Sequence, residues 1–375
     1  MRIYSKETVY DATIRRLHWI YDEFPNVVVS VSGGKDSTVI FEMTLAVARE
    51  RGRLPLNVMW IDQEAEWGST VEQNRHVMYH PDVKPYWMQI PMKLFNATSG
   101  GDNWLNCWKP EDAAKWIHPQ DPISIKENRY GTDRFSRLFT KIVGVEFASQ
   151  KTANIGGVRA EESPSRLVGL TYRPKYKWVT WGKIFDRKLE HYTFYPIYDW
   201  SYTDVWKAIH QHEWRYNEVY DTMYRFGIPI QYMRVSNVHH ETAVKQLFFL
   251  QEFEPHTYSR LCDRLAGIDM AGKLGDDDYF VRELPFMFKD WPEYRDYLLE
   301  NLMEREDWRE KLRKAFANDD QRMGAVVGER MYKSHVQSIL THDWEGIKIK
   351  NFRNTMAVQG KRPPLSDRRS GKVPI

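Results

Sequence analysis

The sequence predicts an α/β fold built on a doubly wound parallel sheet, and three observations support this prediction. Short β-branched runs alternate with segments whose apolar residues follow helical spacing, which is typical of parallel βαβ units. A glycine-rich stretch directly follows the first β-branched run. Hydrophobic residues make up 42% of the 375 residues, which is enough for a substantial core.

The elements of this sheet are predicted in order along the first hundred residues. Residues 27–31, Val-Val-Val-Ser-Val, have the composition of a buried parallel strand. Gly52 is typical of the residue that follows a helix. The predicted elements are a helix over 10–21, strands over 27–31, 56–61 and 86–90, and helices over 37–49 and 68–79.

The pattern weakens beyond these elements and then returns. Residues 96–135 contain several Gly and Pro residues and are expected to form an irregular insertion. A strand over 153–158 returns the chain to the sheet, and 168–172 and 193–196 are expected to be extended. Ser201 and Asp204 have the spacing of a capping box and predict a helix start.

Composition divides the chain into three parts. The main domain is predicted over residues 1–275, a small helical module over 276–347, and a basic flexible tail over 348–375. The tail contains eight Lys and Arg residues and one acid, Asp367. Such a tail can contact a polyanion such as nucleic acid, although a solvated tail without a partner is the alternative.

The sequence also bears on location and redox chemistry. No run of 18 apolar residues is present, so no membrane contact is expected, and the first residues lack an apolar signal core. A cytoplasmic protein is therefore predicted. Cys107 and Cys262 are the two cysteines, too few for a disulfide framework or a Cys-only iron–sulfur cluster, so we expect reduced thiols and no cluster.

The stretch Ser-Gly-Gly-Lys-Asp-Ser at residues 32–37 predicts a phosphate-binding loop. Glycines let backbone N–H groups approach phosphate oxygens, and the start of the following helix adds partial positive charge. Lys35 adds a full charge, while Ser32, Ser37 and Thr38 add hydroxyl donors. The spacing differs from the GxxxxGK[ST] loop of Walker A proteins. A plain glycine turn between a strand and a helix is the alternative.

Residues 32–37 resemble the PP-loop, SGGxDS, of the ATP pyrophosphatase superfamily. Residues 157–166 are similar to the GxRxxESxxR element of its phosphoadenosine phosphosulfate (PAPS) reductase and ATP sulfurylase branch, and residues 196–206 are similar to that branch's P-I-x-x-W-x-x-x-D-V-W element. The resemblance spans about residues 25–265 and is nearest to IbrA-type PAPS reductase-like proteins. It implies the adenine nucleotide alpha hydrolase-like fold with a C-terminal helical extension.

The loop and the resemblance together predict a site for an adenine nucleotide, ATP or PAPS. Lys35, Asp36 and Arg159 are the predicted catalytic residues, with Asp36 a possible ligand of Mg²⁺. Arg234 is a further candidate for pocket charge. The predicted nucleotide-binding residues are Ser32, Gly33, Gly34, Lys35, Asp36, Ser37, Thr38, Asp62, Gln63, Gly157, Arg159, Glu162, Ser163 and Arg166.

Two of these groups have simpler alternatives. Asp62 and Gln63 follow the second strand, where ligands bind in doubly wound sheets, and the resemblance implies nucleoside contact; a strand-end acid is the alternative. Arg159 and Arg166 can bind a phosphate or sulfate group, whereas an Arg–Glu surface network is the alternative.

One departure from the family pattern shapes the predicted reaction. Thioredoxin-dependent PAPS reductases carry a cysteine in an ECGLH-like motif near the C-terminus, and this motif is missing from the sequence. We therefore expect an enzyme that cleaves ATP between the α- and β-phosphates, adenylylates a second substrate and releases pyrophosphate. The alternatives are a PAPS-using reductase or sulfotransferase, and a nucleotide-sensing regulator with DNA or the ParB-like partner that the IbrA resemblance implies.

Overall fold

The computed structural model describes residues 6–96, 98, 104–148, 150–172, 175–230, 233–235, 238, 244–269, 283–303, 305–340, 349–350 and 352–353. The chain forms two compact units. The first comprises Met1–Leu94, Trp104–Val238 and Gln246–Arg264, and the second comprises Phe95–Asn103, His239–Lys245 and Leu265–Ile375. In the described part of the chain, no helix is both long enough and apolar enough to cross a membrane.

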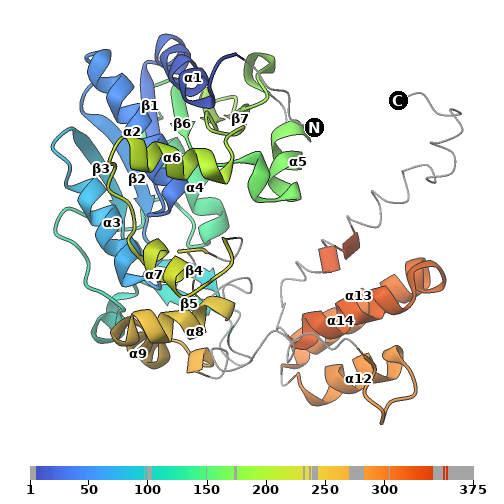
Figure 1. The fold of residues 1–375 in the computed structure, drawn as a ribbon. Coiled ribbons are helices and arrows are strands. Elements are labelled where there is room, and N and C mark those ends of the chain that lie inside the picture. The colour runs from blue at the N-terminus through green and yellow to red at the C-terminus, as the bar shows by residue number, and fades with distance from the viewer. Residues whose placement is uncertain are drawn as a thin grey trace, which may run out of the picture. The chain divides into compact units, whose positions relative to one another are not determined.

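A six-stranded sheet, in the order β3-β2-β1-β6-β8-β7, organises the first unit (Figure 1). Its strands run parallel except β7, which pairs antiparallel with β8. The strands are β1 (Asn26–Ser30), β2 (Leu56–Ile61), β3 (Val83–Met88), β6 (Thr152–Ile155), β7 (Gly182–Asp186) and β8 (His191–Phe194), and a separate pair is formed by β4 (Met92–Phe95) and β5 (Trp104–Cys107).

The strand order reverses direction at β1. The chain moves outward from β1 to β2 and β3, and then returns to place β6 on the other side of β1. Val29 of β1 pairs with Val58 of β2 and with Ile155 of β6. In open α/β sheets such a reversal leaves a crevice at the carboxyl ends of the two central strands, where ligands bind.

Helices flank this sheet, giving the α/β architecture predicted from the sequence. The helices are α1 (Val9–Glu23), α2 (Lys35–Glu50), α3 (Gly68–Met78), α4 (Phe135–Glu146), α5 (Pro164–Tyr172), α6 (Tyr202–Gln211), α7 (Val219–Arg225), α8 (Val244–Phe253) and α9 (Pro255–Arg264), with 3₁₀ turns at Pro110–Lys115, Ala160–Glu162 and Tyr176–Trp178. The core joins apolar residues of α1, α2 and the central strands, among them Leu17, Ile40 and Val29, which are fully buried. Each such side chain stabilises the fold by about 2 kcal/mol relative to an exposed one.

The second unit contains the helices α12 (Trp291–Asn301), α13 (Glu306–Val327) and α14 (Glu329–Leu340). Leu299, Phe316 and Ile339 lie in its own hydrophobic core. Two residues of the basic C-terminal segment also belong to it. Ile349 is buried in this core, and Arg353 pairs with Asp319 of α13 through Nε at 2.7 Å.

Some local predictions were wrong. Residues 168–172 were expected to be extended but lie in α5, where Pro164 occupies the start of the helix, a position that tolerates proline. The region 96–135 contains β5 and a 3₁₀ turn, and β7 and α4 were not predicted at all.

Candidate active site

The loop after β1 is shaped by glycine at two positions. Gly33 has φ of +68°, and a Cβ atom there would lie 2.7 Å from Cγ2 of Thr70, so both the backbone and the space require glycine. Gly34 caps α2 without a side-chain hydrogen bond. The first N–H groups of α2 therefore face the crevice at the strand-order reversal without a side-chain cap, as in anion-binding helix starts.

The hydroxyl groups of the loop form hydrogen bonds that stabilise the turn. Ser37 Oγ donates to the Gly34 carbonyl at 2.8 Å, and Thr38 Oγ1 donates to the same oxygen at 3.2 Å. The Ser32 N–H donates to Ser37 Oγ at 3.2 Å. These side chains hold the loop in shape before any ligand arrives.

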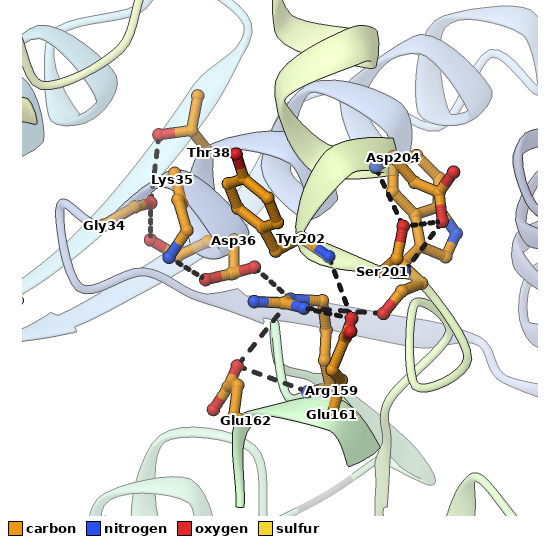
Figure 2. Close-up of polar contacts among 12 residues, drawn as sticks. Gly34, Lys35, Asp36, Thr38, Arg159, Glu161, Glu162, Ser201, Tyr202 and Asp204 are labelled. Atoms are coloured by element: carbon orange, nitrogen blue, oxygen red, sulfur yellow. Dashed lines mark hydrogen bonds and ion pairs between the residues drawn. The ribbon is translucent and has the colours of Figure 1, made fainter. Parts of the chain in front are cut away.

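Asp36 links the loop to the segment that follows β6. Its Oδ2 lies 3.0 Å from Nζ of Lys35, and its Oδ1 accepts from Nε of Arg159 (Figure 2). Arg159 is 4% exposed and also donates to the Trp200 carbonyl at 3.5 Å. The Asp36 carboxylate therefore positions two cations at one edge of the sheet.

Gly157 allows these two segments to touch. A Cβ atom at Gly157 would lie 2.7 Å from the carbonyl oxygen of Asp36 and 3.0 Å from the nitrogen of Ser37. A side chain cannot be accommodated against rigid backbone at that distance. Gly157 is therefore needed for the close approach of the β6 loop to the start of α2.

The segment after Arg159 adds further polar side chains at the same edge of the sheet, those of Glu162, Ser163 and Arg166. Nε of Arg166 lies 2.8 Å from Oε2 of Glu162, and the Arg166 N–H donates to Ser163 Oγ at 3.2 Å. Burial raises the pKa of Glu162, against the lowering effect of Arg166. The Arg–Glu network considered from the sequence is thus present, and it also faces the cavity described next.

A cavity of about 750 Å³ lies over the loop. Among its described lining residues are four cationic side chains, those of Lys35, Arg159, Arg166 and Arg234, and three carboxylates, those of Asp36, Glu161 and Glu162. Predicted site residues that line it are Ser32, Gly34, Lys35, Asp36, Ser37, Gly157, Arg159, Glu162, Ser163 and Arg166. Gly33 and Thr38 are not among the lining residues, although Thr38 donates to the carbonyl of Gly34, which is one of them.

Two tyrosines that line the cavity were missed by sequence reasoning. Tyr220 is buried, its Oη accepts from the Lys35 N–H at 3.4 Å, and its ring centroid lies 5.4 Å from Lys35 Nζ. Burial, and secondarily the charge of Asp36, raise the pKa of Tyr220, so its hydroxyl stays protonated. Tyr202 lies within the 196–206 element, whereas no sequence signal pointed to Tyr220.

Asp62 and Gln63 are not brought into this cavity. Asp62 is fully buried and accepts from Trp87 Nε1 and Gln89 Nε2, each at 2.9 Å. Gln63 is also buried, and its carbonyl accepts from Sγ of Cys107 at 3.2 Å. Both side chains lie among internal contacts at the end of β2, and nucleoside contact by them stays a prediction.

Comparison with known proteins bears on this arrangement. Residues 26–227, which contain the loop, the Arg159 segment and Tyr220, match the phosphoadenosine phosphosulfate reductase domain family. The chain belongs to this family. Residues 227–359 match a second family, a domain of unknown function (DUF3440).

Individual relatives are more distant. The uncharacterized protein YbdN of Escherichia coli (strain K12) is 28% identical over 326 residues, covering 81% of this chain and 78% of that protein. The adenosine 5'-phosphosulfate reductase of Anoxybacillus flavithermus is 30% identical over 118 residues, covering 29% of this chain and 46% of the reductase.

Solved structures align more weakly. The PAPS reductase of Candida auris, a phosphate complex, aligns with a TM-score of 0.35 and 16% identity, over 64% of this chain and 98% of that chain. The FMN adenylyltransferase of Candida glabrata, with FMN and an ATP analogue, gives a TM-score of 0.39 and 13% identity, over 64% and 66%. Scores this low support no further conclusion.

Neither cysteine of this PAPS reductase family member lines the cavity. Cys107 is 1% exposed, and burial raises the pKa of its thiol well above the ordinary value. A nucleophilic thiol needs a lowered pKa and access to its substrate. Cys107 therefore has the properties of a packed structural thiol.

The residues present do not form a ready magnesium site. Over the described ranges, no group of three or more His, Cys, Asp or Glu side chains is placed to hold a metal ion. Both carboxylate oxygens of Asp36 are engaged by cations, Lys35 and Arg159. Binding of Mg²⁺ by Asp36 stays a prediction from the sequence, and no chemical step below depends on it.

Proposed function

We propose that this chain binds ATP over the 32–38 loop, cleaves it between the α- and β-phosphates, and adenylylates a second substrate. One observation carries the proposal. At the reversal of strand order, Lys35, Arg159, Arg166 and Arg234 converge on a cavity of about 750 Å³ that has no cysteine among its lining residues. The cavity suits a polyanion, and it holds no thiol that could take a sulfonate.

The proposed reaction needs little from the protein beyond position and charge. An oxygen or nitrogen of the second substrate attacks the α-phosphorus and forms a new bond to it. The bond from that phosphorus to the oxygen bridging to the β-phosphate breaks, pyrophosphate leaves, and the proton of the nucleophile passes to solvent. Lys35 and the N–H groups of α2 would hold the departing pyrophosphate, and Arg159 would neutralise charge at the α-phosphate.

Membership in the PAPS reductase domain family favours a second candidate, a sulfonucleotide-using reductase or sulfotransferase. Sulfonucleotides present the same adenine and phosphate groups to the cavity. Reduction would require a thiol from another molecule, because Cys107 is buried and neither Cys107 nor Cys262 lines the cavity. A regulator that binds nucleotide without turnover, with DNA or a ParB-like partner, is the third possible outcome of the experiment below.

The position of radioactive label distinguishes these outcomes. The purified chain is incubated with ATP labelled at the α- or γ-phosphate together with fractionated small-molecule extract. Adenylylation transfers the α-label to a new product and the γ-label to pyrophosphate. Release of γ-label as inorganic phosphate would contradict the proposal, sulfite from ³⁵S-labelled PAPS would support the second candidate, and binding without any product would support a regulator.

The variant Lys35→Ala tests whether the loop binds ATP. A charge-assisted contact contributes about 1.5–3 kcal/mol, so ATP affinity should fall about 10- to 150-fold by calorimetry. Lys207→Ala removes an exposed lysine outside the cavity lining and is the matched control, with unchanged affinity expected. Equal ATP affinity in both variants would refute binding over the loop.

A further inference from the structure

A second cavity of about 480 Å³ adjoins the first and shares Tyr202 and Tyr220 with it. Its described lining comes from α6, α7, the segment between them, and Ile230 and Met233 after α7. Aromatic rings dominate this lining, including those of Trp206, Trp214 and Tyr216. We call it the aromatic pocket.

Trp206 meets two neighbouring rings of the aromatic pocket at steep angles. The Trp206 ring lies 5.3 Å from that of Tyr216 with an interplanar angle of 84°, and 5.5 Å from that of Tyr220 with an angle of 81°. Trp206 therefore meets two tyrosines nearly at right angles. Aromatic rings can stack on another planar ring, and they attract a cation placed over their faces.

Charge in the aromatic pocket has the opposite sign to that of the nucleotide cavity. The carboxylates of Asp221 and Glu213 line it, and among its described lining residues there is no Lys or Arg. Tyr216 Oη donates to both carboxylate oxygens of Asp221 at 2.8 Å. Burial, helped by Asp221, raises the pKa of Tyr216 to about 12, so Tyr216 remains a neutral donor.

We infer that the aromatic pocket binds a planar ring compound that carries a positive charge. Its rings attract a cation by about 0.5–2 kcal/mol, and the two carboxylates repel anionic compounds, including the nucleotide phosphates. Resting on the proposed function, this compound is the second substrate, because the shared Tyr220 places the pocket directly beside Lys35 of the loop.

Three indole compounds of different charge test the pocket on the full chain without nucleotide. Tryptamine is cationic, indole is neutral and indole-3-acetate is anionic at pH 7. Calorimetric titration should give tryptamine at least tenfold higher affinity than indole-3-acetate, with indole between them. Equal affinities, a preference for the anion, or no binding of tryptamine at millimolar concentration would each overturn the inference.

Variants locate the binding. Trp206→Ala should abolish tryptamine binding, while Trp178→Ala is the matched control, because Trp178 is 91% exposed and lies outside the pocket lining. Asp221→Asn preserves size and should lower tryptamine affinity about tenfold while leaving indole affinity unchanged. If Trp206→Ala alters the circular dichroism spectrum, the tryptamine affinity of Asp221→Asn tests the location of binding in its place. Unchanged tryptamine affinity in folded Asp221→Asn protein would refute a charge-selective pocket.

The adenylylation proposal and the aromatic-pocket proposal can be refuted independently of each other. Tryptamine binding without transfer of α-label from ATP would refute adenylylation and retain the pocket. Transfer of α-label in a chain that does not bind tryptamine would refute the pocket and retain adenylylation. When both hold, extract fractions that contain cationic aromatic compounds should be those that accept the α-label.

Discussion

Asp36 and Arg159 meet across 123 positions of the chain, and their contact organises the candidate site. Sequence reasoning predicted both residues as functional but could not pair them. Asp36 belongs to the first turn of α2, and Arg159 follows β6. The pairing exists because β6 returns to the far side of β1, so two loops meet at one edge of the sheet. The Asp36 carboxylate contacts both Lys35 and Arg159, and Arg159 also lies within 4.0 Å of the carboxylates of Glu161 and Glu162.

At the same scale, Gly157→Ala tests the close approach of the two loops. The new Cβ would collide with the backbone of Asp36 at 2.7 Å, so the start of α2 must shift. We expect a loss of about 1–3 kcal/mol in the free energy of unfolding, typical of overpacking, with at least tenfold weaker ATP binding. Urea unfolding and calorimetry measure the two effects.

Gly169→Ala is the matched control. Gly169 lies in α5, and a Cβ there would have its nearest neighbour, Lys183 Nζ, at an ordinary 3.6 Å. Alanine in a helix is favoured over glycine by about 0.5–1 kcal/mol, so this variant should be slightly stabilised with normal ATP affinity. If Gly157→Ala and Gly169→Ala bind ATP with equal affinity, the close approach of the β6 loop to the start of α2 is not needed for ATP binding.

Elements with strong local signals were predicted correctly. The capping box that Ser201 and Asp204 predicted is present. Ser201 Oγ accepts from the Asp204 N–H at 3.1 Å, and Asp204 accepts from the Ser201 N–H at 2.7 Å. The β-branched run became β1, with Val27, Val28 and Val29 buried. By contrast, β7 is an edge strand with a half-buried pattern and few local signals, and it was not predicted.

The helical unit should be sensitive to acid through His335 of α14. His335 is buried, stacks on Phe316 at 4.2 Å between ring centroids, and lies 3.0 Å from Asp319, whose charge is shared with Arg353. Burial outweighs the nearby Asp319 and lowers the pKa of His335 to about 4.

The sign of the effect follows from proton binding. Between pH 6.5 and 4 the unfolded chain binds a proton at His335 and the folded chain does not, so the free energy of unfolding falls as pH drops through this window. The slope should approach about 1.4 kcal/mol per pH unit. His335→Gln should flatten it in denaturant titrations at pH 7, 6 and 5, whereas His210→Gln, at an exposed position, should not. An equally steep slope in His335→Gln would contradict this account.

On the scale of the whole molecule, all the described residues that line the cavity over the 32–38 loop belong to the first unit. That unit also has its own hydrophobic core. A chain ending at Arg264 should therefore bind ATP within about threefold of the full chain, a difference below ~0.7 kcal/mol. Loss of ATP binding in a truncated protein with a native-like circular dichroism spectrum would show that the second unit contributes to the site.

The basic segment 348–375 lies largely outside the described residues, and a nucleic-acid partner for it stays a proposal. Two of its residues, Ile349 and Arg353, pack into the helical unit. Any polyanion contact therefore falls to the remaining lysines and arginines. A chain that lacks residues 354–375 loses most of them and keeps α12, α13 and α14, so loss of salt-dependent DNA binding by that chain would support the proposal.

The amino-acid sequence by itself determined the α/β class, and it predicted the glycine-rich loop before α2 and most residues that line the cavity over that loop. These features depend on local patterns: β-branched runs, glycines before a helix, and motifs of a few residues. Tertiary structure alone decided which of these residues meet. It paired Asp36 with Arg159, placed Tyr220 against Lys35, withdrew Asp62 into contacts with Trp87 and Gln89, and opened the aromatic pocket beside the loop. Such contacts join residues far apart in the chain, and they arise from strand order and close packing, which short sequence patterns do not encode.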